Sequence, residues 1–391
     1  MTTDVYQELA ALREAFRALA RLRDDAAARS LAALVVRRYD RLRSAGDDDV
    51  LRAVFRFLTD EFAPDPGALG SAVDRWRNEP TPARAQELWH AAEAPRLELL
   101  RSINLADDGI HTLLTMRGDL LALADPLAAP VEQDLAYLLN SWFNRGFLEL
   151  RGIDWTTPAL TLEKLIEYEA VHEIRGWDDL RRRLEDDRRC YGFFHPSLPA
   201  EPLIFVEIAL VDGLATRIAD VIDAPPPGAD APTPDTAIFY SITNCQQGLR
   251  GVPLGDFLLK QVIAELERTV PSLRRFATLS PVPGLREWAE STGVEVDESA
   301  RSRRHATARY LLTAKRGAEP LDPVARFHLR NGARLEQINV DGDRSAKGER
   351  ESFGVLVNYL YDPAMLDDNH DAYVNEGAVA HSPEIAAVLE D

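Results

Sequence analysis

The pattern of apolar and polar positions divides the chain into two halves. Up to about residue 146, apolar residues recur at three- and four-residue intervals while Arg and Glu occupy the other faces, which predicts amphipathic helices. The clearest helical stretches are 31–45, 50–62, 83–103 and 131–143. Turn signals rich in Gly, Asp and Pro separate them. The first half is therefore predicted to be an all-helical bundle.

Beyond residue 146 the apolar runs become short and rich in strand-forming residues. We expect strands in the runs 147–155, 190–196, 202–210, 236–242, 275–282, 326–338 and 353–361, and helices at 162–171 and 177–187. The segment 224–235 is rich in proline and without periodicity, so it is predicted to be a surface loop. The second half is predicted to be a mixed α/β domain, which places the domains at 1–146 and 147–391.

Composition narrows the possible partners. The formal net charge of −19 argues against a nucleic-acid binder or a binder of anionic membranes, because either needs a basic face. No apolar run approaches membrane-spanning length. The two cysteines, Cys190 and Cys245, match no metal spacing and suit a reducing compartment. With a polar, acidic N-terminus, these features predict a cytoplasmic protein.

One stretch, 236–269, has the order of an anion-binding device: an apolar strand, a glycine loop and an amphipathic helix. Loop amides and a helix N-terminus attract phosphate groups. The loop resembles the pattern with which acetyltransferases hold the CoA pyrophosphate. Its candidate CoA-binding residues are Gln247, Gly248, Arg250, Gly251 and Gly255.

The loop departs from that pattern at Pro253, where a glycine is usual. Proline has no N–H to donate, so one backbone contact to phosphate must be lost or replaced. The alternative to a CoA-binding loop is an ordinary turn between a strand and a helix. A nicotinamide site would need Gly-x-Gly-x-x-Gly directly after a strand, and that pattern is absent from this loop.

Several side chains could carry chemistry beside this loop. Ser241 ends the predicted strand and Thr243 follows two residues later, so either hydroxyl could touch a thioester. His328 stands just before an Asn-Gly turn signal, at the end of a helix or a strand. Tyr359 and Tyr361 alternate, so in a strand both face one side. Each of these residues, taken alone, is more simply explained by packing or capping.

Two further observations concern binding. His195 lies in a proline-rich link between two strands, where it shapes either a substrate pocket or only a tight turn. The histidines at 172, 195 and 328 and the two cysteines have no spacing typical of metal ligands, so no metal site is predicted.

Taken together, the second-half motifs resemble the malonyl-CoA decarboxylase family in its bacterial, cytoplasmic form. The resemblance runs from about residue 110 to 365. It rests on EAVHEIRGWDDLRRRLEDDRRCYGFFHPSLPAEPLIFVEIAL, AIFYSITNCQQGLRGVPLGDFLLKQVIAELE, FATLSPVPGLREW, FHLRNGARLEQIN and GVLVNYLY. LLNSWFNRGFLEL is similar to the family's domain junction.

The resemblance implies a helical oligomerisation domain, giving a homodimer or homotetramer, and a catalytic domain with the acetyltransferase-like (GNAT) fold. It implies that malonyl-CoA is the substrate and that no biotin, metal or other cofactor is needed. It implies catalytic roles for Ser241, His328 and Tyr361, with Thr243 a competitor for the serine's role. The family's second CoA-contact segment corresponds to 213–219, with Gly213, Thr216 and Ala219 as binding residues.

These roles lead to a mechanistic hypothesis. Loss of CO2 leaves a thioester enolate, which must be stabilised and then protonated at C2. We expect His328 to be the proton donor, hydrogen-bonded to Ser241, because a histidine with a pKa of ~6.5 is a general acid near neutral pH. Tyr361 would position the imidazole or the thioester. A CoA-dependent acyltransferase and a non-catalytic acyl-CoA sensor remain the alternatives.

Overall fold

The computed structural model describes residues 2–22, 24–228, 230–252 and 255–390, which form two compact units. One unit comprises Met1–Phe147 together with Gln246–Val252, and the other comprises Leu148–Cys245 and Pro253–Asp391. The short segment Gln246–Val252 follows a strand of the second unit directly, yet it packs with the helices of the first. The sequence pattern did not predict this exchange.

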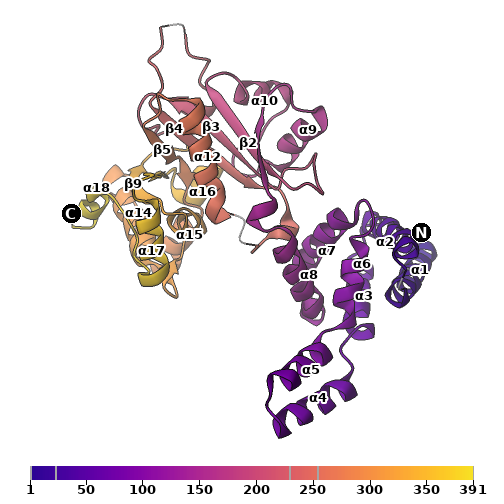
Figure 1. Ribbon diagram of the computed structural model, residues 1–391. Coiled ribbons are helices and arrows are strands. Elements are labelled where there is room, and N and C mark those ends of the chain that lie inside the picture. The colour runs from indigo at the N-terminus through magenta and orange to yellow at the C-terminus, as the bar shows by residue number, and fades with distance from the viewer. Residues whose placement is uncertain (1, 23, 229, 253–254, 391) are drawn as a thin grey trace. The chain divides into compact units, whose positions relative to one another are not determined.

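The first unit is helical, as predicted (Figure 1). Its helices are α1 Thr2–Arg21, α2 Asp25–Ser44, α3 Asp48–Glu61, α4 Pro66–Asn78, α5 Pro82–Ala92, α6 Pro95–Ile103, α7 Gly109–Leu123 and α8 Ala129–Trp142, with short 3-10 helices η1 Pro126–Ala128, η2 Arg145–Phe147 and η3 Gln247–Leu249. Among the described helices of the whole chain, none combines the length and apolarity that crossing a membrane requires.

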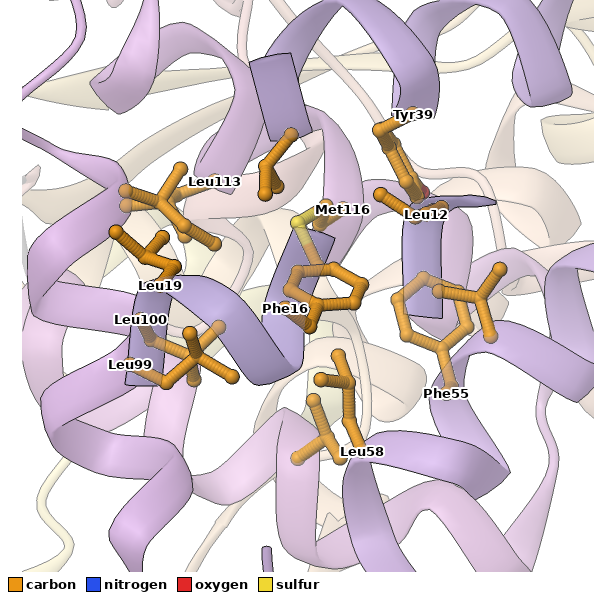
Figure 2. Packing of buried hydrophobic residues seen from close by; sticks show 14 of the residues in the cluster. Leu12, Phe16, Leu19, Tyr39, Phe55, Leu58, Leu99, Leu100, Leu113 and Met116 are labelled. Atoms are coloured by element: carbon orange, nitrogen blue, oxygen red, sulfur yellow. The ribbon is translucent and has the colours of Figure 1, made fainter. Parts of the chain in front are cut away.

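The core of this unit forms where the apolar stripes of several helices meet. Figure 2 shows Phe16 of α1, Tyr39 of α2, Phe55 of α3 and Met116 of α7 converging, and all four side chains are fully buried. Burying a side chain of this size typically contributes about 1.5–3 kcal/mol. The apolar residues at three- and four-residue spacing therefore form the surface through which the helices of the bundle contact one another.

One predicted helix is wrong in its extent. The stretch 83–103 forms two helices, because α5 ends at Ala92 and α6 begins at Pro95. Proline lacks the N–H that an inner helical turn needs, but it fits the first turn of a new helix. The apolar period continues across the break, which is why the pattern alone suggested one element.

The second unit is built on one mixed sheet with helices around it. Its strands are β1 Glu149–Ile153, β2 Arg188–Phe194, β3 Ile204–Val211, β4 Thr236–Asn244, β5 Arg275–Thr278, β6 Ser280–Pro281, β9 Arg334–Asn339 and β10 Leu356–Leu360, while β7 Lys315–Arg316 and β8 Glu319–Pro320 form a separate pair. Its helices are α9 Ala159–Tyr168, α10 Trp177–Arg183, α11 Ala219–Ile222, α12 Gly255–Thr269, α13 Leu285–Thr292, α14 Ala300–Thr313, α15 Pro323–Arg330, α16 Ala346–Ser352, α17 Leu366–Glu376 and α18 Pro383–Glu390.

The sheet has the order β1-β2-β3-β4-β5-β10-β6, with β9 paired to β10. β4 and β5 are parallel, whereas the other described pairings within this sheet are antiparallel. Parallel neighbours need a crossover, which α12 supplies. The predicted order, a helical half followed by a mixed α/β domain, is confirmed.

The run 326–338 is a second correction, since it was expected to be a strand. Its first part belongs to α15, and only Arg334–Asn339 is a strand. Asp322 accepts a hydrogen bond from Ala325 N at 2.7 Å, and Pro323 occupies the first helical turn. This cap and proline are a standard helix start. They place His328 in the last turn of a helix rather than on a strand.

Candidate active site

His328 is the centre of a buried polar cluster in the second unit. Its side chain is almost inaccessible to solvent. Nδ1 lies 2.7 Å from the hydroxyl of Tyr361, and Nε2 lies 3.0 Å from Oγ of Ser280. The ring of Tyr359 stacks on the imidazole with centroids 4.6 Å apart. Helix α15 thus places one imidazole between the hydroxyl of Ser280 in β6 and that of Tyr361 just after β10.

The protonation state of this histidine differs from the sequence-based expectation. Burial lowers the pKa of His328 from 6.5 to about 3, because an apolar surrounding penalises the charged ring. The free site therefore holds a neutral imidazole at neutral pH, with a hydrogen on only one of its nitrogens. Burial also keeps Tyr361 protonated by raising the pKa of its hydroxyl well above the usual value.

Ser280 reaches the imidazole because of the sheet topology. β5 runs parallel to β4, and Ser280 follows it in the short strand β6, whose partner is β10. Its hydroxyl also lies 2.8 Å from Oγ1 of Thr278. Asn358 of β10 donates to Thr278 O at 2.7 Å, which ties this part of the sheet together. The serine is therefore held from two sides and aimed at Nε2.

The predicted hydrogen bond between Ser241 and His328 is wrong. Ser241 Oγ lies 2.9 and 2.8 Å from the two carboxylate oxygens of Glu169 and 3.2 Å from Thr243 Oγ1. The cause is a bulge in β4, where Ile208 pairs with Phe239 and Glu207 pairs with Ser241. An inserted residue re-aims the side chains that follow it. Phe239 accordingly contacts the ring of Tyr361, while Ser241 is directed to Glu169.

Glu169 accepts hydrogen bonds from Ser241 and Thr243, the two hydroxyls that the sequence analysis proposed for the active site. Its carboxylate accepts from Thr243 Oγ1 at 3.2 Å and from the backbone N–H groups of Val171 and His172 at 2.7 and 2.8 Å. These hydrogen bonds fix the position of the carboxylate. Ser241 and Thr243 therefore serve as anchors for the turn after α9, and a catalytic role for Ser241 stays a prediction.

The candidate CoA loop alternates between inward and outward residues. Gly248 and Leu249 are buried, whereas Gln247, Arg250 and Gly251 are exposed. Gly251 has φ +81°, a left-handed conformation that glycine adopts without strain. The side chains of Gln247 and Arg250 are thus available to a ligand.

Not every amide of this loop is directed outward. The N–H groups of Leu249, Arg250 and Val252 donate to the carbonyls of Gln246, Gln247 and Leu249 at 2.9, 3.1 and 2.9 Å. The expected effect of Pro253 lies outside the described residues. Gly255 begins α12, as the predicted order of strand, loop and helix requires.

The other predicted binding segment, 213–219, lies beside β10. Asn358 Nδ2 donates to Ala215 O at 3.0 Å, and Ile218 N donates to Gly342 O at 2.9 Å. Gly213 N donates to Asp235 at 2.9 Å, Thr216 is exposed, and Ala219 begins α11. The segment is anchored near β10, which carries Tyr359 and directly precedes Tyr361, and its contact with CoA stays a prediction.

His195 has a local structural contact. Its Nδ1 accepts a hydrogen bond from Ser197 N at 3.2 Å, and His195 forms an isolated bridge with Leu198. This arrangement matches the tight-turn interpretation, while a part in substrate binding stays a prediction. Within the described ranges, no group of three His, Cys, Asp or Glu side chains is placed to hold a metal ion.

Sequence reasoning missed Ser280 as a candidate, although its surroundings carried a signal. The serine lies in the run LSPVPG, after an apolar run and directly before two closely spaced prolines. A hydroxyl at the end of a strand is as good a candidate at Ser280 as it is at Ser241. Glu169 carried a weaker signal, because a lone glutamate after a helix is ordinarily solvated.

Comparison with known proteins gives one consistent family. Residues 62–143 match the model described as the malonyl-CoA decarboxylase N-terminal domain, and residues 146–303 and 293–391 match the C-terminal domain. The mitochondrial malonyl-CoA decarboxylase of Anser anser anser is 33% identical over 379 residues, covering 83% of this chain and 73% of that protein. The mitochondrial enzyme of Rattus norvegicus is 33% identical over 361 residues, with 78% and 73% covered.

Solved structures agree. The malonyl-CoA decarboxylase of Rhodopseudomonas palustris superposes with a TM-score of 0.89 at 41% identity, covering 98% of this chain and 99% of that one. The malonyl-CoA decarboxylase of Agrobacterium vitis gives a TM-score of 0.89 at 42% identity, with 97% and 99% covered. The similarity therefore includes both the helical half and the mixed sheet.

Proposed function

The chain belongs to the malonyl-CoA decarboxylase family and decarboxylates malonyl-CoA to acetyl-CoA and CO2, and we propose that His328, Ser280 and Tyr361 carry out the chemistry. The observation that supports this assignment is the buried imidazole with one hydroxyl at each ring nitrogen. Ser280 takes the role that the sequence gave to Ser241. A buried, hydrogen-bonded cluster of this kind suits a reaction that must protect an enolate from its surroundings.

The first step breaks the bond between the carboxylate carbon and C2 of the malonyl group. The bonding electrons move onto C2 and the thioester oxygen, forming an enolate as CO2 leaves. The thioester carbonyl accepts this charge, so we propose that no metal or other cofactor is needed. The enzyme's task is to hold the carboxylate out of the plane of the carbonyl and to supply hydrogen-bond donors where the charge develops.

The second step adds a proton to C2. Ser280 and His328 are hydrogen-bonded to each other, and we propose that the pair delivers this proton, after which one proton from solvent restores the pair. Tyr361 fixes the orientation of the ring through Nδ1. General acid catalysis of this kind typically contributes about 10²–10⁴ in rate.

We further propose that the loop around Arg250 binds the CoA pyrophosphate. The exposed side chains of Gln247 and Arg250 and the left-handed Gly251 support this role. A guanidinium group is well suited to phosphate because it offers a planar set of donors. The Arg250→Ala variant is expected to raise mainly the KM for malonyl-CoA, and an unchanged KM would remove Arg250 from the site.

The reaction is tested by incubating the pure protein with malonyl-CoA in D2O. We expect CO2 and acetyl-CoA carrying one deuterium from solvent in its methyl group. An acyltransferase would release no CO2 and would wait for an acceptor, whereas an acyl-CoA sensor would bind without turnover. The His328→Asn variant is expected to lose turnover while retaining CoA affinity; turnover at the level of the unmodified protein would contradict its role.

We propose that the helical unit mediates a homodimer or homotetramer. The support is the α4–α5 hairpin, which stands apart from the other helices of its unit (Figure 1). None of the described residues of α5 is buried, and Trp89 is 67% exposed. An exposed tryptophan on a helix without buried residues is typical of interfaces. Light scattering should show an oligomer that the Trp89→Arg variant weakens; a monomeric wild-type protein would contradict the proposal.

A cytoplasmic location is proposed on the basis of the cysteines. Cys190 and Cys245 are both free and buried. Thiols that remain unpaired are typical of a reducing compartment. Fractionation of cells with an antibody against the protein tests this, and recovery outside the cytoplasmic fraction would contradict it.

A further inference from the structure

A buried arginine of the helical half holds the loop that follows β4. Arg117 of α7 is only 5% exposed, and its Nη1 donates to the carbonyl oxygen of Gly248 at 2.6 Å. The same guanidinium donates from Nε to Glu132 of α8 at 3.0 Å, while Nη2 lies 2.8 Å from that carboxylate. The arginine therefore links two helices to the backbone of the candidate CoA loop.

The loop lies directly on α7. A Cβ atom on Gly248 would stand 2.1 Å from the carbonyl oxygen of Leu114, a distance that real Cβ atoms do not reach. On the other side of the contact, a Cβ on Gly118 would lie 3.7 Å from Gln247 Cβ and from Gly248 N. Only a glycine allows the loop backbone to come so close. Arg117 then fixes the position by bonding the same residue.

This contact determines which residues the loop presents outward. With Gly248 and Leu249 held against α7, the neighbouring Gln247 and Arg250 are exposed. A flexible loop would have to lose conformational freedom when it bound an anion, and that loss would weaken binding. A loop fixed before binding avoids most of this cost.

We propose that Arg117 is a positioning residue for the phosphate-bearing part of the substrate. It acts through Gly248 and sets the geometry of the loop that binds the CoA pyrophosphate, an inference that rests on the function proposed above for that loop. The helical unit would then contribute to substrate recognition as well as to assembly.

A merely structural role for Arg117 predicts a different result from a positioning role. Malonyl-pantetheine keeps the reacting thioester but lacks the pyrophosphate and the nucleotide. If Arg117 acts through the pyrophosphate loop, its substitution raises the KM for malonyl-CoA and leaves the KM for malonyl-pantetheine unchanged. If Arg117 only stabilises the fold, activity toward both substrates falls by the same factor.

The test compares KM and kcat for the two substrates in Arg117→Lys, which keeps a positive charge beside Glu132 but loses the planar fork. We expect the KM for malonyl-CoA to rise about tenfold, the effect of losing one hydrogen bond from a charged group. We expect kcat and the KM for malonyl-pantetheine to change less than twofold. Arg96→Lys is the matched control, because Arg96 is also buried and pairs with Asp134 of α8 in the same unit.

Gly248→Ala is a second, independent perturbation of the same contact, and it is expected to show the same selective loss. An equal loss for both substrates, or no loss for malonyl-CoA, in both variants would overturn the proposal. Arg250→Ala separates this failure from failure of the loop's proposed function. If Arg250→Ala reduces the preference for malonyl-CoA and Arg117→Lys does not, only the positioning role is wrong. If neither reduces it, the loop does not bind the pyrophosphate.

Discussion

The neutral state of the buried imidazole predicts a specific loss of stability in acid. The pKa of His328 is about 3 in the folded protein and 6.5 in an unfolded chain. Between these values the unfolded state binds a proton that the folded state does not bind. Stability that is present above pH 6.5 is therefore lost as the pH falls toward 3.

The size of the effect follows from the two pKa values. At pH 5, protonation of His328 in the unfolded state lowers the free energy of unfolding by RT ln(1 + 10^1.5), which is about 2 kcal/mol. The ring in the folded state remains essentially neutral at this pH. At pH 7 the same contribution is only about 0.2 kcal/mol. A His328→Gln variant keeps a neutral hydrogen-bonding side chain but cannot titrate, so it lacks this contribution.

The assay is urea unfolding of both proteins at pH 7 and pH 5. Hydrogen exchange of the β10 segment is the readout, because β10 lies in the same unit as His328. The free energy of unfolding of the histidine protein should fall by about 2 kcal/mol more than that of the variant. Parallel losses in the two proteins would refute the idea that His328 is buried in its neutral form.

Three further predictions test the surroundings of the site. Tyr361→Phe leaves Nδ1 of His328 buried without its partner. The free energy of unfolding, measured with urea, should therefore fall by about 1–3 kcal/mol, and kcat, measured by CO2 release, should fall by at least about tenfold. An unaltered kcat would show that Tyr361 takes no part in the reaction. Gly251→Ala forces a side chain into a left-handed conformation at a cost of about 1 kcal/mol, which should raise the KM for malonyl-CoA, and an unchanged KM would show that the loop tolerates the strain. Burial raises the pKa values of the thiols of Cys190 and Cys245, so iodoacetamide should label neither in the native protein at pH 7.5, and stoichiometric labelling detected by mass spectrometry would contradict their burial.

The sequence predicted the elements of the fold better than their junctions. Apolar periods identified the bundle and most strands of the second unit, because these elements bury the faces that the periods define. The break at Pro95 and the start of α15 at Pro323 were missed, although both prolines were visible. In each case the apolar pattern continued through the boundary and outweighed a local signal.

The candidate site was predicted only in part, for a topological reason. His328 and Tyr361 were identified, and the structure brings them together at 2.7 Å. Ser241 was proposed because of the family resemblance and because it ends the predicted strand before the glycine loop, and Ser280 was not considered. The bulge in β4, where Tyr240 is the extra residue, is invisible in the apolar pattern, and it decides which way Ser241 points. Spacing along one strand does not report such an insertion.

The packing of Gln246–Val252 on the helical unit was equally hidden. A loop after a strand is ordinarily assigned to the domain of that strand, and nothing in its composition indicates another partner. Arg117 lies in a helical pattern 131 residues from its partner Gly248. Contacts at such separation follow from the assembled fold, which a reading of local patterns does not provide.

The most direct test of the active-site assignment compares Ser280→Ala with Ser241→Ala. The measurement is kcat for malonyl-CoA decarboxylation, with the dissociation constant for CoA as a control for folding and loop integrity. Ser280→Ala should lower kcat by about 10²–10³ and leave CoA binding unchanged, because it removes the hydroxyl at Nε2 of His328. Ser241→Ala should lower kcat by less than about tenfold, because Thr243 and the backbone amides still hold Glu169. A large loss in Ser241→Ala with full activity in Ser280→Ala would contradict the account.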